Sequence, residues 1–91
     1  MTSILQTDKR CWFCPCENGL EKHHVFAGVA NRKLSEKYGL WVWVCHEHHT
    51  GKNGVQYDPE KGRELKRYAQ GVFEITHSHA EWMKVFRKNY L

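Results

Sequence analysis

Two pairs of potential metal ligands, each separated by two residues, place the strongest constraint on this 91-residue chain. Cys11-x-x-Cys14 lies near the start, and Cys45-x-x-His48 lies at the middle. A two-residue gap lets both side chains of one turn converge on a single ion, and two such pairs supply the four ligands of a tetrahedral zinc. The sequence therefore predicts a structural Zn²⁺ that would contribute folding free energy directly, on the order of 10 kcal/mol in small zinc peptides.

The fourth cysteine, Cys16, lies just beyond the first pair. It can replace Cys14 as a ligand or remain nearby as a free thiol. Disulfides are another use for four cysteines, but they are rare in a reducing cytosol, and the clustering with histidine favours a metal. A chain of this length buries only about 60–65% of its unfolded surface, so a small core gains from such a staple.

The composition predicts one folded, cytoplasmic domain. Hydrophobic residues make up 41% and aromatic residues 13% of the chain, which is too rich for disorder. No apolar run approaches the roughly 18 residues of a membrane span, and the start has no apolar signal-peptide segment. We expect residues 1–10 to form a flexible arm and residues 11–91 a single domain. A net charge of +4 is compatible with a polyanionic partner without establishing one.

The first half of the chain predicts two antiparallel strands with an excursion between them. Residues 20–26 can form a strand with His23 and His24 on opposite faces, unless a bulge turns one of them. Residues 40–45 are aromatic and β-branched throughout and form the best strand candidate. Residues 28–39 between them should form one or two helical turns.

The second half predicts helices that brace the strands, which makes the fold class α+β. A short helix should run from His46 to about Gly51, and residues 55–57 should be extended. Asp58-Pro59 is a helix start signal, and the apolar stripe that follows predicts a helix over residues 59–75. A second helix should begin at the capping box from Ser78 to Glu81.

The pair His23-His24 and the single His49 form a second constellation. If His48 binds the structural zinc, His49 is free to point elsewhere. Fixing Cys45 and His48 would fix the short helix, which would then present His49 towards the paired strands. We therefore expect these three imidazoles to gather around one further ion.

These motifs together resemble the HNH nucleases, also called ββα-metal or His-Me finger nucleases, in the version with a zinc knuckle. Cys11-Trp-Phe-Cys14, His23-His24-Val25 and Val44-Cys45-His-Glu-His48-His49 occur in that family's order. The stretch from Ala30 to Leu40 and the ending Lys88-Asn-Tyr-Leu91 look like small phage proteins identified as RecA-dependent or recombination-enhancement nucleases. The resemblance covers about residues 9–91. It implies a ββα-metal core with a zinc knuckle, braced by two C-terminal helices.

The resemblance implies a role for each histidine of the second constellation. His23 would be a metal ligand, His24 the general base and His49 the second metal ligand. A neutral imidazole can take a proton from water at cellular pH, which agrees with the role of His24. The ion would be Mg²⁺ or Mn²⁺ and would stabilise charge on the scissile phosphate and on the leaving 3′ oxygen.

The chain departs from the family's pattern at two positions. The stretch Tyr38-Gly39-Leu40 stands where many relatives have Asn-Leu, so whether Asn31 takes the role of the HNH asparagine stays open. Related phage sequences read Gly-Val-His where this chain has Gly54-Val55-Gln56. The third ligand of the catalytic metal is therefore open between Gln56 and Asn53.

Basic residues predict contact with DNA phosphates. Those in loops or turns beside the expected site are Arg32, Lys33, Lys37 and Lys52, and a helical group, Arg63, Lys66 and Arg67, can equally be a solvated face. His46, His77 and His79 are expected at the surface. The resemblance implies DNA as substrate, single-stranded or displaced-loop, and a dependence on RecA filaments. The alternative function is a non-catalytic zinc-binding module that docks on DNA or on a recombination protein.

Overall fold

The computed structural model describes residues 2–52 and 54–91 and has the α+β fold predicted from the sequence. Its sheet has two antiparallel strands, β1 (Leu20–His24) and β2 (Trp41–Cys45), in which Leu20 pairs with Cys45 and His24 with Trp41. The ten-residue helix α1 (Val29–Tyr38) connects them. A single turn of helix, α2 (His46–His49), follows β2 directly.

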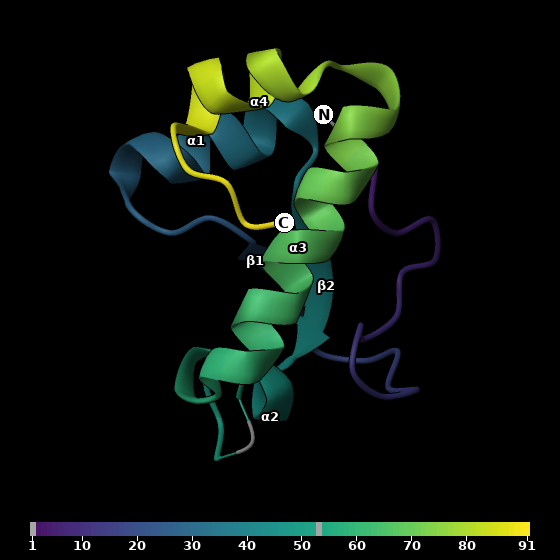
Figure 1. The fold of residues 1–91 in the computed structure, drawn as a ribbon. Coiled ribbons are helices and arrows are strands. Elements are labelled where there is room, and N and C mark those ends of the chain that lie inside the picture. Colours follow the sequence, from purple (N-terminus) through teal and green to yellow (C-terminus); the bar gives the residue numbers. More distant parts are fainter. Residues whose placement is uncertain (1, 53) are drawn as a thin grey trace.

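Two longer helices complete the fold. After the 3₁₀ turn η1 (Val55–Tyr57), α3 (Pro59–Thr76) runs across the hairpin, and α4 (His79–Phe86) turns back beside α1 (Figure 1). In this view α1 and α4 lie at one end of the molecule and α2 lies at the other. The predicted start signals act as expected, because Asp58 caps α3 and the Ser78 side chain caps α4.

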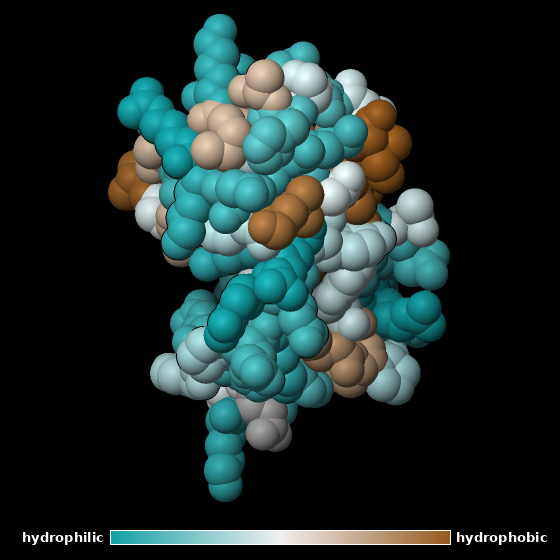
Figure 2. Space-filling view, viewed as in Figure 1, coloured by the Kyte–Doolittle hydropathy of each residue, from teal (hydrophilic) through white to brown (hydrophobic). Residues whose placement is uncertain are grey.

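The hydrophobic core lies between the hairpin and the C-terminal helices. Its buried members are Leu5, Val25, Phe26, Leu40, Val42, Leu65, Ala69, Phe73 and Trp82. The face of the molecule that α3 crosses is mostly hydrophilic, with hydrophobic residues in small separate patches (Figure 2). Among the described residues, no helix combines the length and the apolar character that crossing a membrane would require.

Residues 3–6 pack against β2 instead of forming the flexible arm expected from their sequence. The Ser3 hydroxyl donates a hydrogen bond to the Trp41 carbonyl, and the Gln6 side chain accepts one from the Trp43 amide at 2.9 Å. Leu5 is buried in the core. Gly39 permits this docking, because it has φ 69° and a Cβ there would collide with the Thr2 backbone oxygen. The segment thereby covers the free edge of β2.

The extended conformation predicted for residues 55–57 is wrong, since these residues form η1. The Tyr57 amide donates to the Gly54 carbonyl at 3.0 Å, and the Asp58 amide donates to the Val55 carbonyl at 3.4 Å. Val55 is buried while Gln56 and Tyr57 are exposed. The compact turn buries the Val55 side chain and positions Asp58 at the start of α3.

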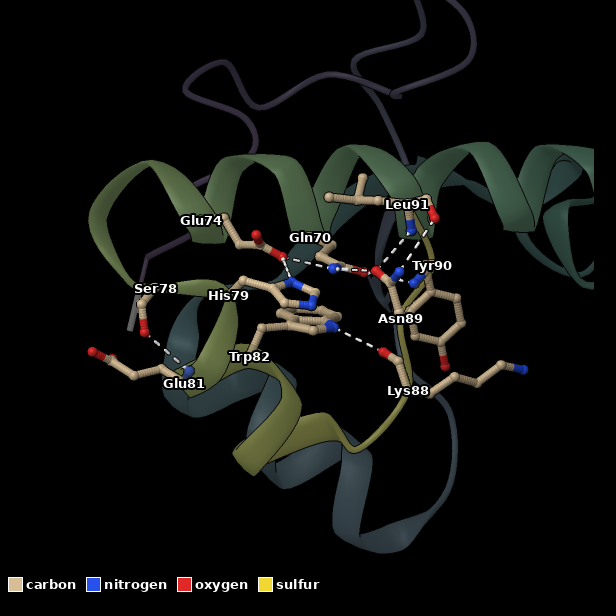
Figure 3. A network of polar contacts seen from close by, with 10 residues as sticks. All are labelled: Gln70, Glu74, Ser78, His79, Glu81, Trp82, Lys88, Asn89, Tyr90 and Leu91. Atoms are coloured by element: carbon tan, nitrogen blue, oxygen red, sulfur yellow. Dashed lines mark hydrogen bonds and ion pairs between the residues drawn. The ribbon is translucent and has the colours of Figure 1, made fainter.

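Trp82 joins α4 and the C-terminal segment to the core. Its side chain is fully buried, and its Nε1 donates to the Lys88 carbonyl at 2.8 Å (Figure 3). Beside it, the buried Gln70 side chain donates to Asn89 at 2.8 Å and accepts from the Tyr90 amide at 2.7 Å. These contacts anchor the last four residues of the chain on α3 and α4 (Figure 3).

Trp82→Ala is expected to lower the free energy of unfolding by about 3–5 kcal/mol, because it leaves a large cavity in the core. Chemical denaturation followed by circular dichroism measures this change. The control is Ile75→Ala on α3, whose side chain is 78% exposed, and it should change the free energy of unfolding by no more than about 0.5 kcal/mol. If both variants lost the same free energy of unfolding, Trp82 would not be a main contributor to the stability of the core.

Candidate metal centre and histidine groove

The four predicted zinc ligands converge in the structure. Cys11 and Cys14 lie in the loop before β1, Cys45 ends β2, and His48 lies on α2. Their ligand atoms all lie within 4.8 Å of one another. Cys14 Sγ is 3.7 Å from Cys45 Sγ, and His48 Nδ1 is 3.2 Å from Cys45 Sγ and 4.0 Å from Cys11 Sγ.

The donor set of this Cys₃His group suits zinc. Tetrahedral zinc with bonds of about 2.3 Å to sulfur and about 2.0 Å to nitrogen needs ligand atoms roughly 3.5–3.8 Å apart. The three individual distances, 3.2 to 4.0 Å, lie close to that range, and the whole group lies within 4.8 Å. None of the four cysteines is in a disulfide, and burial raises the pKa of the Cys45 thiol. A bound dication would offset this effect by stabilising the thiolate. The group could therefore hold a metal ion such as zinc.

Cys16 does not belong to the converging group. Its Sγ donates instead to the Asn18 carbonyl at 3.3 Å. The Cys16 carbonyl nevertheless closes the loop, since it accepts a hydrogen bond from the Cys11 amide at 2.8 Å. The Trp12 amide then donates to the Trp43 carbonyl at 2.8 Å, which ties the loop to β2. Backbone contacts therefore hold the first ligand pair beside the second.

His48 of the Cys₃His group lies on α2, and the same helix presents His49 to β1. The His49 and His23 rings lie edge to face with centroids 5.3 Å apart. His49 Nδ1 is 2.7 Å from Glu21 Oε1, and hydrogen bonds from His49 and then from His46 lower the pKa of Glu21. Because an ionised carboxylate only accepts hydrogen bonds, Nδ1 is the protonated nitrogen of a neutral His49. Nε2 is then left free as a ligand atom.

His23, His24 and His49 all line one groove of about 690 Å³ between β1, α1, α2 and the start of α3. The cations that line it are Lys22, Arg32, Arg63 and Lys66. Burial is the main reason that the pKa of His23 falls to about 4, and electrostatic interactions with neighbouring side chains, that with His49 first, add to the shift. His23 is therefore neutral at pH 7 and can offer a lone pair.

His24 reaches the groove from the other face of β1. Its Nε2 is 2.9 Å from Glu36 Oε2 on α1, and Lys22 Nζ contacts the same carboxylate at 3.0 and 3.3 Å. The strand alternation predicted for the histidine pair is thus observed without a bulge. The groove extends around the strand, because both histidines line it.

The other predicted site residues are only partly gathered. Gln56 and Arg32 line the groove, but Asn53 lies outside the described residues. Lys33, Lys37 and Lys52 are exposed and are not among the residues that line it. Within residues 2–52 and 54–91, the Cys₃His group is the only set of three or more His, Cys, Asp or Glu side chains whose ligand atoms converge.

Glu21 and Glu36 are site residues that sequence reasoning missed. Glu21 lies two residues before His23, so the strand period puts both on one face, and this signal was available. Glu36 meets His24 only because α1 folds against β1, and no local pattern predicts that contact. His46 and His79 are exposed, as expected, whereas His77 is half-buried and stacks on Phe73. All three pair with carboxylates.

The fold and this group define a small α+β protein with a Cys₃His site that could hold a metal such as zinc. No protein-family model and no solved structure matches the chain. A curated protein similar to it is human CWF19-like protein 1, which is 26% identical over 87 residues. The match covers 88% of this chain and 15% of that protein, so the chain spans a small part of its relative.

Proposed function

We propose that this protein is a metal-dependent DNA endonuclease with an HNH-type ββα-metal core. The observation that carries the proposal is that His23, His24 and His49, taken from two elements, line a single groove together with four cations. Imidazoles and cations around one groove suit a phosphodiester substrate, because the cations bind the phosphate while an imidazole accepts or donates a proton. The elements follow one another as a strand, a helix, a second strand and a short helix, and the Cys₃His group lies where the second strand meets the short helix. This order agrees with the family that the sequence resembles.

His23 and His49 are the proposed ligands of a Mg²⁺ or Mn²⁺ ion, with Gln56 on the groove wall as a candidate third ligand. Such an ion would supply a Lewis acid for the phosphate and the leaving oxygen. Glu21 supports His49 as a ligand, because a carboxylate on Nδ1 fixes the ring and increases the basicity of Nε2. The structural zinc acts indirectly, since it holds α2 in place.

His24 is the proposed general base. It takes a proton from a water molecule, and the hydroxide attacks phosphorus as the bond from phosphorus to the 3′ oxygen breaks. The departing 3′ oxygen takes up a proton from a solvent water molecule, and His24 afterwards releases its proton to solvent. The products carry a 5′ phosphate and a 3′ hydroxyl. One such site cuts one strand, so a nick is the direct product.

Supercoiled plasmid incubated with Mg²⁺ or Mn²⁺, with and without RecA filaments on single-stranded or displaced-loop DNA, tests this function. The proposal expects relaxed plasmid or cleaved strand in at least one of these reactions. DNA that stays intact in all of them contradicts it. A requirement for the filament would identify a recombination protein as the partner.

A non-catalytic zinc-binding module that docks on DNA or on a recombination protein is the second candidate. It is favoured by one observation, that only the Cys₃His group among the described residues forms a converging ligand set. Under this alternative the protein binds DNA or the filament, and no metal added to the reaction produces cleavage.

Lys66→Ala and Arg63→Ala are each expected to weaken DNA binding at all sequences. Both side chains line the groove from α3, and each lost phosphate contact should reduce the slope of log affinity against log salt by about 0.9 on duplex DNA. Fluorescence anisotropy without added Mg²⁺ or Mn²⁺ measures both quantities. Lys84→Ala, at an exposed position on α4, is the matched control and should leave affinity and slope unchanged. If all three variants changed the affinity and the slope equally, the groove would not be the DNA-binding surface.

A further inference from the structure

Glu36 connects α1 to the side chains on one face of β1. Its carboxylate accepts from His24 Nε2 at 2.9 Å and from Lys22 Nζ at 3.0 Å, so each oxygen has a partner. Lys22 and His24 are two residues apart on the strand and share this face. One turn earlier on α1, Arg32 lines the groove. The helix between the strands therefore contributes a carboxylate and a cation to the same site.

The contact with Glu36 determines which nitrogen of His24 is free. Hydrogen bonds from His24 and then from Lys22 lower the pKa of Glu36, so it is an ionised carboxylate at neutral pH. An ionised carboxylate has no proton to donate, and a neutral imidazole has only one N–H. The proton of His24 therefore lies on Nε2, and Nδ1 carries the lone pair.

We propose that Glu36 is a positioning residue that holds His24 in the Nε2–H tautomer, so that Nδ1 is the atom that accepts the proton of the attacking water. The inference rests on the proposed nuclease function and identifies the atom that acts in it. Lys22 pairs with the same carboxylate, since its Nζ lies 3.0 Å from one oxygen and 3.3 Å from the other. A carboxylate in this position opposes a rotation of the imidazole ring that would swap the positions of Nδ1 and Nε2.

Glu36→Gln tests this role with two readouts. Nitrogen NMR of ¹⁵N-histidine-labelled, zinc-loaded protein at about pH 8, where an ordinary histidine is neutral, identifies the tautomer of each ring. Wild type should show His24 as Nε2–H, and the variant should show a mixture, because an amide can donate as well as accept. In plasmid cleavage, the kcat of the Glu36→Gln variant should be about 10- to 100-fold lower than that of wild type, and its KM should change by less than about twofold.

The matched control is Glu81→Gln. Glu81 accepts from His77 at 2.9 Å, the same distance as in the Glu36 contact, but it lies on α4 and does not line the groove. This variant should keep the wild-type kcat and leave the His24 tautomer unchanged. Lys22→Gln is a second variant that retains Glu36 and His24, and it should raise KM while His24 stays Nε2–H.

The outcomes separate this inference from the proposed function. A wild type that cuts DNA, together with a folded Glu36→Gln variant of equal kcat or unchanged His24 tautomer, overturns the positioning role alone. A wild type that leaves DNA intact under every condition overturns the nuclease function and the positioning role with it. A fall in kcat that accompanies a mixed tautomer, with Glu81→Gln unaffected, supports the assignment.

Discussion

Removing the metal from the Cys₃His group is expected to unfold the protein. The loop with Cys11 and Cys14, the end of β2 and the start of α2 all meet at this group, so its loss releases three segments at once. Structural zinc contributes on the order of 10 kcal/mol in small domains, which is comparable to the whole stability of a chain of this length. A strong chelator should therefore abolish the cooperative thermal transition seen by circular dichroism.

Two cysteine variants test the same expectation without a chelator. Cys45→Ser should reduce the metal content measured by elemental analysis and leave the chain unfolded. Cys16→Ser is the matched control, because the Cys16 sulfur is not one of the converging ligand atoms and donates to the Asn18 carbonyl. The side chain packs against the cluster that contains Cys11 and Cys45, and serine is of similar size, so this variant should keep one zinc per chain and the wild-type Tm. A metal-free protein that melts at the same temperature as the untreated one would contradict the structural role of the metal.

His24→Ala is expected to slow DNA cleavage by about 100- to 10,000-fold, which is the usual contribution of a general base. The variant should still bind zinc, because His24 lies on β1 and is not in the Cys₃His group. It should also bind DNA with an affinity close to that of wild type, since the cations of the groove remain. Rates of plasmid nicking at saturating Mg²⁺ or Mn²⁺ measure the loss.

The control for this variant is His79→Ala. His79 is also a histidine bonded to a carboxylate, with its Nδ1 3.0 Å from Glu74, but it lies on α4 and does not line the groove (Figure 3). It should cut at the wild-type rate. If His24→Ala and His79→Ala cut equally fast, His24 is not the base, and if wild type does not cut either, the docking module is preferred.

Features that depend on residues close together in the sequence could be predicted. The zinc spacing, the caps at Asp58 and Ser78, and the two strands follow from short-range chemistry, and the structure contains all of them. The antiparallel pairing of residues 20–26 with 40–45 was also predictable, because only these segments carry strand character and a helix-length connection separates them.

Features that depend on contacts distant in sequence were not predictable. Residues 3–6 lack any periodicity, yet Ser3 and Gln6 satisfy the backbone groups at the edge of β2 and Leu5 enters the core. Glu36 was missed because a glutamate on a polar helix is ordinary until the helix docks on His24. Both cases require knowing how elements pack, which a single sequence does not state.

The proposed nuclease requires two distinct metal sites, one that holds the fold and one that acts on DNA. Anomalous scattering from crystals grown with Mn²⁺, collected at the zinc and manganese edges, tests this most directly. We expect a zinc peak among Cys11, Cys14, Cys45 and His48 and a separate manganese peak in the groove at His23 and His49. Zinc alone, with no manganese in the groove at a concentration that would support cleavage, would contradict it.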